Sequence, residues 1–136
     1  MNFFKEWKYQ LLYKDYRPIW RLKMWYQRIK WGWCDEDVWG LGHHLAEVIA
    51  GSLKQLKRNQ RGHPAQFTEK QWNEILDKMI RGFDACAKED DVYYGEIGNN
   101  ITRETVKKAM KNQEKRVKQW EKDMQLFVEN ILSLWD

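Results

Sequence analysis

The sequence predicts an all-α protein of four to five helices, built as a helical bundle with a long C-terminal heptad helix. Apolar side chains recur at steps of three or four residues along nearly the whole chain, which is the spacing of one helix face. Only two prolines are present, Pro18 and Pro64, and each stands where this pattern breaks. With 136 residues, the chain is long enough for one domain, or for one domain with an arm.

The first 31 residues differ from the rest in charge and in aromatic content. They contain ten of the twenty aromatic side chains and carry a net charge of +6, whereas the remaining residues carry −2. We therefore expect a basic aromatic helical arm at residues 1–31 and a helical domain at residues 32–136. Within the arm, one helical piece is expected at residues 3–16, and a second from Pro18 to the residue before Gly32.

An arm of this composition has three interpretations. Its aromatic side chains can pack on the body of the protein or on a second subunit. Tryptophan, tyrosine and cations interleaved on a helix also suit the interface of a membrane. A basic aromatic segment can equally bind nucleic acid. The residues leave these interpretations open, although many tryptophan side chains without any partner are the least expected outcome.

A third helix is expected from Cys34 and Asp35 to about Arg58. Its first turn is acidic and its last turn is basic, which matches the dipole of a helix. Its predicted buried face consists of residues at helical spacing: Val38, Leu41, Leu45, Val48, Ile49, Ser52 and Leu56.

The fourth helix has the clearest start in the chain. Thr68 and Gln71 have the spacing of a capping box, in which each side chain satisfies a free backbone N–H of the other. Phe67 and Trp72 have the spacing of a hydrophobic staple across the same turn. These four residues predict a helix that begins directly after Thr68.

The connection to the last helix and the last helix itself follow from composition and spacing. The fourth helix is expected to end within residues 88–91, and the glycines and asparagines of residues 92–100 predict an irregular connection. Thr102 then caps the longest helix. At about 1.5 Å per residue, roughly 33 residues extend about 50 Å, so this helix spans the molecule or reaches into a partner. A homo-oligomer is expected because the helix carries a heptad seam: Val106, Met110, Gln113, Val117, Trp120, Met124, Phe127, Ile131 and Leu134.

Two polar clusters contain residue types that bind metal ions, and each can also be explained as an ordinary surface or structural feature. His43 and His44 are neighbours and point about 100° apart on a helix, so both cannot face one ion. Acidic residues at Glu74, Asp77, Asp84 and the run Glu89–Asp91 suit Mg²⁺, and with it nucleotide hydrolysis, but they also fit a solvated surface. The sequence has no phosphate loop and no serine elbow. We therefore assign no catalytic residue, cofactor or metal.

The candidate ligand-binding residues lie in and beside the predicted loops. Cations cluster where the third helix ends, and their side chains can reach an anion from several directions. Pairing of these cations with the negative end of that helix is the alternative. Two tyrosines in the predicted connection are suited to stacking on a base. The candidate set is Lys54, Arg58, Arg61, His63, Tyr93, Tyr94 and His44.

Four sequence blocks carry a resemblance to known proteins. They are GWCDEDVW at residues 32–39, GHP at 62–64, TEKQWNEILDKMI at 68–80 and LSLWD at 132–136. On these blocks the chain resembles a family of small uncharacterised proteins of tailed bacteriophages and prophages. The resemblance implies a phage origin and action in the host bacterial cytoplasm, where small accessory proteins of this kind often counter host defence. It implies no catalytic residues.

Together, these observations favour a non-enzymatic binding protein that counteracts host defence by sequestering an anionic nucleotide signal. Three alternatives stay open: an inhibitor of a host defence protein, a Mg²⁺-dependent nucleotide pyrophosphohydrolase, and an adaptor that binds membrane or nucleic acid through residues 1–31. The expected partners are a second copy of the chain and either an anionic small molecule or a host protein.

Overall fold

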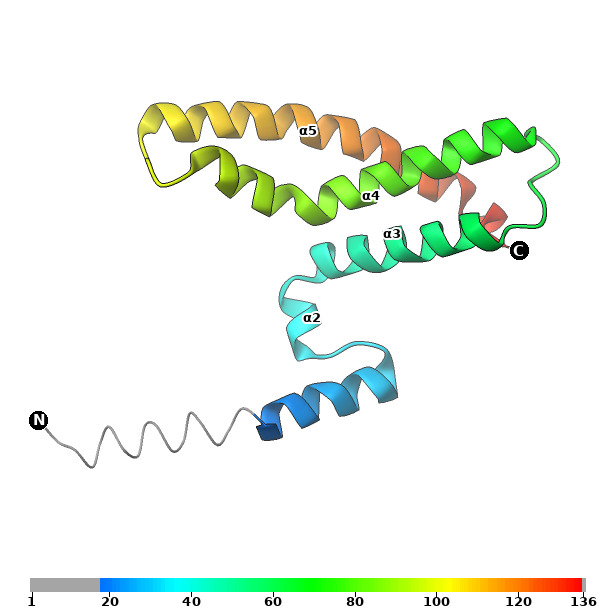
Figure 1. Cartoon of the computed structure of the whole chain (residues 1–136), viewed down its shortest axis with the longest axis horizontal. Coiled ribbons are helices and arrows are strands. Elements are labelled where there is room, and N and C mark those ends of the chain that lie inside the picture. Colours follow the sequence, from blue (N-terminus) through cyan, green and yellow to red (C-terminus); the bar gives the residue numbers. More distant parts are fainter. Residues whose placement is uncertain (1–17, 136) are drawn as a thin grey trace, which may run out of the picture. The chain divides into compact units, whose positions relative to one another are not determined.

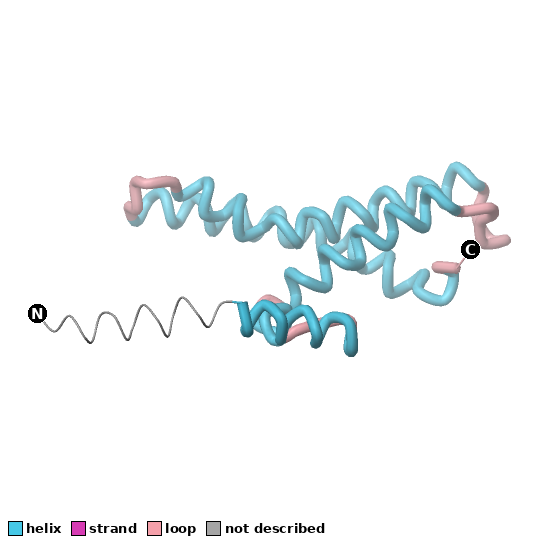
Figure 2. Tube along the Cα trace, turned by 60° about the horizontal axis from the view of Figure 1, so that its bottom comes forward, coloured by secondary structure: helices cyan, strands magenta, loops and turns pink. Residues whose placement is uncertain are grey.

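The computed structural model describes residues 18–135, and 83% of these residues are helical. They contain no β-strand, and Figure 2 shows helices joined by short connections. A helix over residues 18–31 comes first. It is followed by α2 (Asp35–Trp39), α3 (Leu41–Asn59), α4 (Glu69–Ile97), α5 (Arg103–Asn130) and the 3-10 turn η1 (Ile131–Ser133) (Figure 1). The all-α prediction is confirmed, whereas the expected helical piece at residues 3–16 lies outside the described residues.

The chain divides into two compact units, one up to Leu41 and one from Gly42 onward. We describe each unit by itself. Because most of the predicted arm lies outside the described residues, the arm at residues 1–31 and the domain at residues 32–136 stay predictions.

In the first unit, the helix over residues 18–31 ends at Gly32, as predicted. Gly32 has a φ of 80°, a conformation that favours glycine, and its N–H donates to the carbonyl of Arg28 at 2.9 Å. α2 begins after Cys34, whose backbone N–H donates to a carboxylate oxygen of Asp37 at 2.8 Å. Cys34 and Met24 are both buried. The turn between these two helices therefore has a small apolar centre of its own.

The third helix differs from the prediction because it is not continuous. α2 ends at Trp39, and α3 begins at Leu41. Gly40 between them has a φ of −113° and a ψ of 43°, which is not a helical conformation. Two glycines within three residues, Gly40 and Gly42, lower the helix propensity here, which explains the break.

The buried face of α3 also differs from the prediction. Leu45 and Val48 are exposed, whereas Ala46, Ala50 and Leu53 are buried. Ala46, Ala50 and Leu53 belong to the core cluster shared with α4, and two exposed ion pairs with α4 (Lys54–Asp84 and Lys57–Asp77) lie beside this face. Ile49 and Leu56 of the predicted face do pack against the core. The sequence pattern gave more weight to large aliphatic residues than to these alanines, so the predicted face is rotated around the helix from the observed one.

α4 begins as predicted and ends later than predicted. Both hydrogen bonds of the capping box are present, since the Thr68 N–H donates to Gln71 Oε1 at 2.9 Å and the Gln71 N–H to Thr68 Oγ1 at 3.3 Å. Instead of ending within residues 88–91, the helix continues to Ile97, so the irregular connection expected at residues 92–100 is wrong. It stops at Gly98, which has a φ of 59°.

The extra turns of α4 are held by contacts with α5. Arg116 of α5 donates to Glu89 at 2.8 Å, where the helix was expected to end, and to Glu96 at 2.6 Å, within the extra turns. Such tertiary contacts outweigh the low helix propensity of Gly95. Figure 1 shows α4 and α5 lying side by side as a helical hairpin.

α5 begins at Arg103 and is capped by Thr102, as predicted, with the Thr105 N–H donating to Thr102 Oγ1 at 3.2 Å. It ends at Asn130, earlier than expected. Part of its heptad seam packs on α4, where the rings of Phe127 and Phe83 meet edge to face at 5.1 Å. The seam therefore has a partner within the same chain, and it does not by itself require a second copy. Self-association stays a prediction.

The core of the second unit lies between α3, α4 and α5. Its buried members are Ala46, Ala50, Leu53, Trp72, Leu76, Met79, Phe83 and Ala87. Side chains of α5 and the C-terminal turn pack against this cluster, among them Met124, Phe127 and Leu134. Among the described helices, none combines the length and the apolar character that crossing a bilayer requires.

Candidate ligand-binding site

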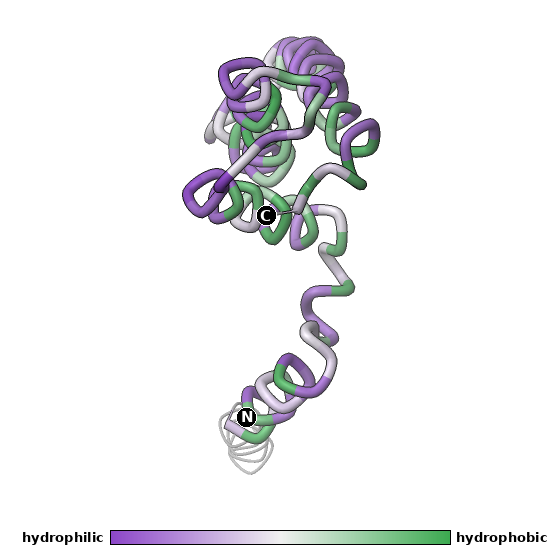
Figure 3. The backbone as a smooth tube through the Cα atoms, turned by 90° about the vertical axis from the view of Figure 1, so that its right-hand side faces the viewer, coloured by the Kyte–Doolittle hydropathy of each residue, from purple (hydrophilic) through white to green (hydrophobic). Residues whose placement is uncertain are grey.

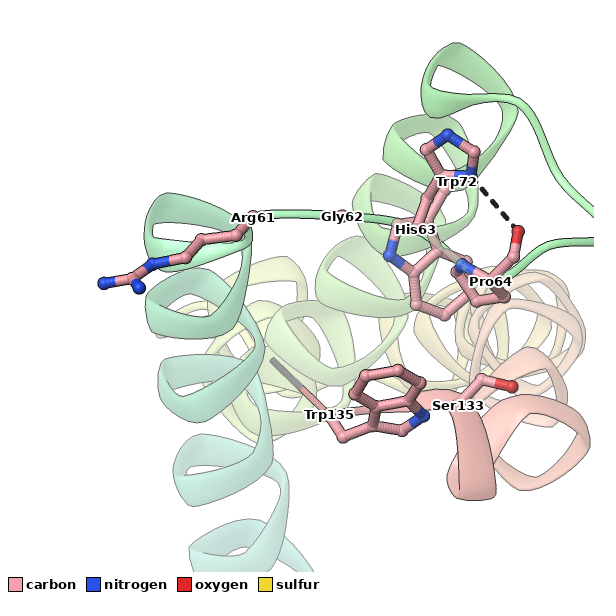
Figure 4. A pocket seen from close by; sticks show the side chains of 7 residues that line it. All are labelled: Arg61, Gly62, His63, Pro64, Trp72, Ser133 and Trp135. Atoms are coloured by element: carbon pink, nitrogen blue, oxygen red, sulfur yellow. Dashed lines mark hydrogen bonds between the residues drawn. The ribbon is translucent and has the colours of Figure 1, made fainter.

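A pocket of about 250 Å³ lies at one end of the second unit, where the α3–α4 loop meets the C-terminal turn. Figure 4 shows its lining, which comes from three separate stretches of sequence: Arg61, Gly62, His63 and Pro64 from the loop, Trp72 from α4, and Ser133 and Trp135 from the C-terminus. Two indole rings and an imidazole thus surround one small cavity.

The loop side of the pocket is held by hydrogen bonds around Pro64. The Phe67 N–H donates to the Pro64 carbonyl at 3.0 Å, which closes the turn before α4. His63 Nδ1 lies 3.1 Å from the same carbonyl (dashed line in Figure 4), so this nitrogen carries the proton and donates. In the neutral imidazole, Nε2 then remains as an acceptor.

The two tryptophans of the pocket have different surroundings. Trp72 is only 3% exposed and stacks on Phe67 with ring centres 5.8 Å apart, so it forms a fixed wall. This contact also confirms the predicted hydrophobic staple. Trp135 is 73% exposed and faces the pocket from the opposite side (Figure 4). A flat ligand can therefore enter against Trp135 without unpacking the core.

Of the predicted cations on and after the last turn of α3, only Arg61 and His63 line the pocket. The guanidinium of Arg61 points away from His63 and Trp135 in Figure 4, so its charge lies outside the cavity. Arg58, one turn earlier in α3, is exposed. An anionic group attracted by these residues would stay at the mouth of the pocket while a ring entered it.

Lys54 does not belong to this site. Its Nζ lies 2.7 Å from a carboxylate oxygen of Asp84, and the neighbouring Lys57 pairs with Asp77 at 2.5 Å. Of the predicted cationic cluster, the structure therefore brings Arg61 and His63 to the pocket and leaves Lys54 in an ion pair on the α3–α4 contact.

Tyr93 and Tyr94 also lie elsewhere. They are in the last turns of α4, with ring centres 5.5 Å apart, rather than in a loop. From Glu69 to Tyr93 the helix rises about 36 Å at 1.5 Å per residue, so these rings cannot stack on a ligand held beside Trp72.

His44 lies in the first turn of α3, whereas the pocket follows the end of this helix. The distance along the helix from His44 to Asn59 is about 22 Å. The Nε2 of the neighbouring His43 lies 3.4 Å from a carboxylate oxygen of Glu47, four residues later.

Several of the acidic residues that suggested Mg²⁺ are engaged by cations. Asp77 and Asp84 pair with Lys57 and Lys54 of α3, and Glu89 pairs with Arg116 of α5. Within residues 18–135, no group of three or more histidine, cysteine or acidic side chains is arranged to hold a metal ion.

Of the seven residues that line the pocket, the candidate set contained Arg61 and His63 and missed five: Gly62 and Pro64 of the same loop, and Trp72, Ser133 and Trp135. Trp72 was assigned to the helix start alone, although the pattern that identified it also places it beside the loop containing His63. Ser133 and Trp135 belong to the distinctive terminal block, but no local rule connects that block with a loop some 70 residues earlier. The approach of the C-terminus to this loop depends on the α4–α5 hairpin.

In comparisons with known proteins, no family model, no curated protein and no solved structure matches this chain.

Proposed function

We propose that this protein binds a small nucleotide-type ligand in the pocket between Trp72 and Trp135, and does so without chemical turnover. The observation that carries the proposal is the meeting of two indoles and an imidazole around one cavity. Every nucleobase has a π face, and stacking on an aromatic side chain contributes about 1–3 kcal/mol per base.

The size of the pocket limits the ligand. Its volume of about 250 Å³ falls just below the roughly 300–1,000 Å³ of pockets that enclose drug-sized molecules. A single base with part of its ribose suits such a cavity, with the phosphate outside near Arg61 and Arg58. The ligand class is therefore a mononucleotide, or one nucleotide of a longer molecule.

Binding without hydrolysis is favoured by the chemistry of the lining. No carboxylate lines the described pocket, and the acidic residues that suggested a magnesium site lie on α4, where Asp84 and Asp77 are in ion pairs with Lys54 and Lys57. A hydrolase of the pyrophosphate type needs acidic ligands for Mg²⁺ beside the phosphates. The arrangement suits capture of a nucleotide better than its cleavage.

The wider role that we propose rests on the phage resemblance. Three of its four sequence blocks, at residues 62–64, 68–80 and 132–136, contribute residues to this pocket. A phage accessory protein with such a pocket would sequester a nucleotide signal in the host bacterial cytoplasm and so weaken the host defence that depends on it.

Calorimetric titration of the purified chain with the four ribonucleoside monophosphates tests the proposal. We expect saturable binding that persists in EDTA, and recovery of intact nucleotide after incubation with Mg²⁺. Trp135→Ala should weaken binding at least tenfold, since it removes the exposed wall. Trp39→Ala is the matched control, because Trp39 is 95% exposed in α2 and belongs to the other unit. Equal affinities of the two variants would refute the site, and release of nucleoside or free phosphate would refute binding without turnover.

A further inference from the structure

The helix over residues 18–31 presents an apolar strip to solvent. Five large side chains of this helix are 58–66% exposed: Ile19, Leu22, Trp25, Tyr26 and Ile29. At about 100° per residue, they fall within an arc of about 120° on the helix surface. A strip of this width is what a helix normally buries against a partner.

The opposite side of the same helix is already occupied. Met24 and Gln27 are buried against the turn that leads into α2. Gln27 Nε2 donates to Asp35 Oδ1 at 3.0 Å, and the Asp35 N–H donates back to Gln27 Oε1 at 3.1 Å. These contacts fix the rotation of the helix, so within residues 18–41 the apolar strip faces away from α2.

Cations border the strip on both sides. By the same 100° spacing, Lys23 and Lys30 lie along one edge, and Arg21 and Arg28 lie along the other. Lys23 and Arg28 pair with Asp35 and Asp37 at 2.9 and 2.8 Å, so Lys30 and Arg21 supply the positive charge that the two borders offer to a partner. Lys30 Nζ lies 5.2 Å from the centre of the Trp31 ring and 5.9 Å from that of Tyr26, so it caps the aromatic edge. Residues 18–31 contain no acidic residue. Figure 3 shows the resulting alternation of hydrophobic and hydrophilic positions along this helix.

We propose that this strip binds the surface of a membrane that contains anionic lipids. Five exposed apolar side chains, two of them tryptophan or tyrosine, suit the boundary between headgroups and acyl chains, and flanking cations suit anionic headgroups. A second copy fits less well, because two such strips face to face bring cationic borders together. Nucleic acid would leave the apolar side chains without a partner.

The inference concerns a surface of the first unit and is independent of the nucleotide pocket in the second. Cosedimentation of the full chain with vesicles tests it, using phosphatidylcholine alone and phosphatidylcholine with 30% phosphatidylglycerol. We expect binding to the anionic vesicles at least tenfold stronger than to the neutral ones. Raising the salt should weaken this binding without abolishing it, because only the electrostatic part is screened.

Ile29→Glu and Val128→Glu form a matched pair of variants. Both side chains are 64% exposed on a helix, and both changes alter the net charge equally, but Val128 belongs to α5. We expect Ile29→Glu to weaken binding to anionic vesicles at least tenfold and Val128→Glu to change it less than twofold, with unchanged circular dichroism for both. Equal behaviour of the pair, or no binding of the unchanged chain to anionic vesicles, would overturn the proposal. So would a dimer in sedimentation equilibrium that Ile29→Glu dissociates, since a second copy would then occupy the strip.

Discussion

Arg81 of α4 and Asp123 of α5 are joined by two parallel hydrogen bonds, each of 2.8 Å, across 42 residues of sequence. The Asp123 carboxylate is buried, whereas the Arg81 side chain remains largely exposed. The hydrogen bonds with Asp123 raise the pKa of the Arg81 guanidinium above its ordinary value. The pair thus fixes the register of the α4–α5 hairpin on which the pocket depends.

Removing one partner of this pair should cost more than removing both. Arg81→Met leaves a buried carboxylate without its donor and should lower the free energy of unfolding by about 1–3 kcal/mol. Adding Asp123→Asn should restore part of this loss, because the buried group is then neutral. Urea unfolding followed by circular dichroism measures both variants and the single Asp123→Asn change as a double-mutant cycle. Additive losses would show that the two residues are not coupled.

Gly82, next to Arg81, marks the closest approach of the two long helices. A Cβ atom at this position would lie 2.7 Å from Asp123 Cβ and 3.1 Å from the Trp120 carbonyl. Although alanine favours a helix by up to about 1 kcal/mol over glycine, Gly82→Ala should destabilise the protein by about 1–3 kcal/mol through overpacking.

Gly95 in the same helix provides the control for this prediction. A Cβ at Gly95 would meet no atom within 4 Å. Gly95→Ala should therefore be neutral or stabilise the protein by up to about 1 kcal/mol. Thermal unfolding of both variants gives the comparison, and a Gly82→Ala protein as stable as Gly95→Ala would show that the helices are not in close contact at this point.

Asp37 makes the first unit sensitive to strong acid. Two hydrogen bonds from Arg28, of 2.8 and 3.2 Å, hold the pKa of the Asp37 carboxyl well below its usual range. A carboxyl whose pKa is lower in the folded state stabilises that state when ionised. This contribution is fully present above the ordinary pKa of about 3.9 and is lost as the pH falls through the folded value.

Carbon-detected NMR titration of the Asp37 carboxyl checks this prediction. The midpoint should lie well below about 3.9 in the unchanged chain, and Arg28→Gln should move it back toward that value. A midpoint near the ordinary value in the unchanged chain would mean that the Arg28–Asp37 pair does not persist in solution.

Local chemistry was enough to predict where α4 and α5 begin and where the helix over residues 18–31 ends. The capping box of Thr68 and Gln71, the cap at Thr102 and the stop at Gly32 each depend on residues within one turn. What the sequence could not reveal are features set by distant partners. The last turns of α4 include Glu96, which pairs with Arg116 of α5, and the buried face of α3 consists of the residues that pack in the core with α4.

In the candidate site, too, residues close together in sequence could be predicted, and residues brought together by the fold could not. Arg61 and His63 were predicted because they lie in one loop, and they do line the pocket. Tyr93 and Tyr94 were grouped with them on the assumption of a second loop, which the structure replaces with helix. Trp135 could not be assigned from sequence, because the hairpin and the turn after α5 bring it to the α3–α4 loop.

The most direct test of nucleotide binding follows the indole N–H resonances of the tryptophans in ¹⁵N-labelled protein during titration with ribonucleoside monophosphates. We predict saturable shifts for Trp72 and Trp135, which line the pocket, and none for Trp39, which is exposed in α2. Resonances can be assigned by single Trp→Phe changes. If the shifts instead fall on Trp25 or Trp39, or if no indole responds at millimolar nucleotide, the pocket between Trp72 and Trp135 is not a nucleotide site.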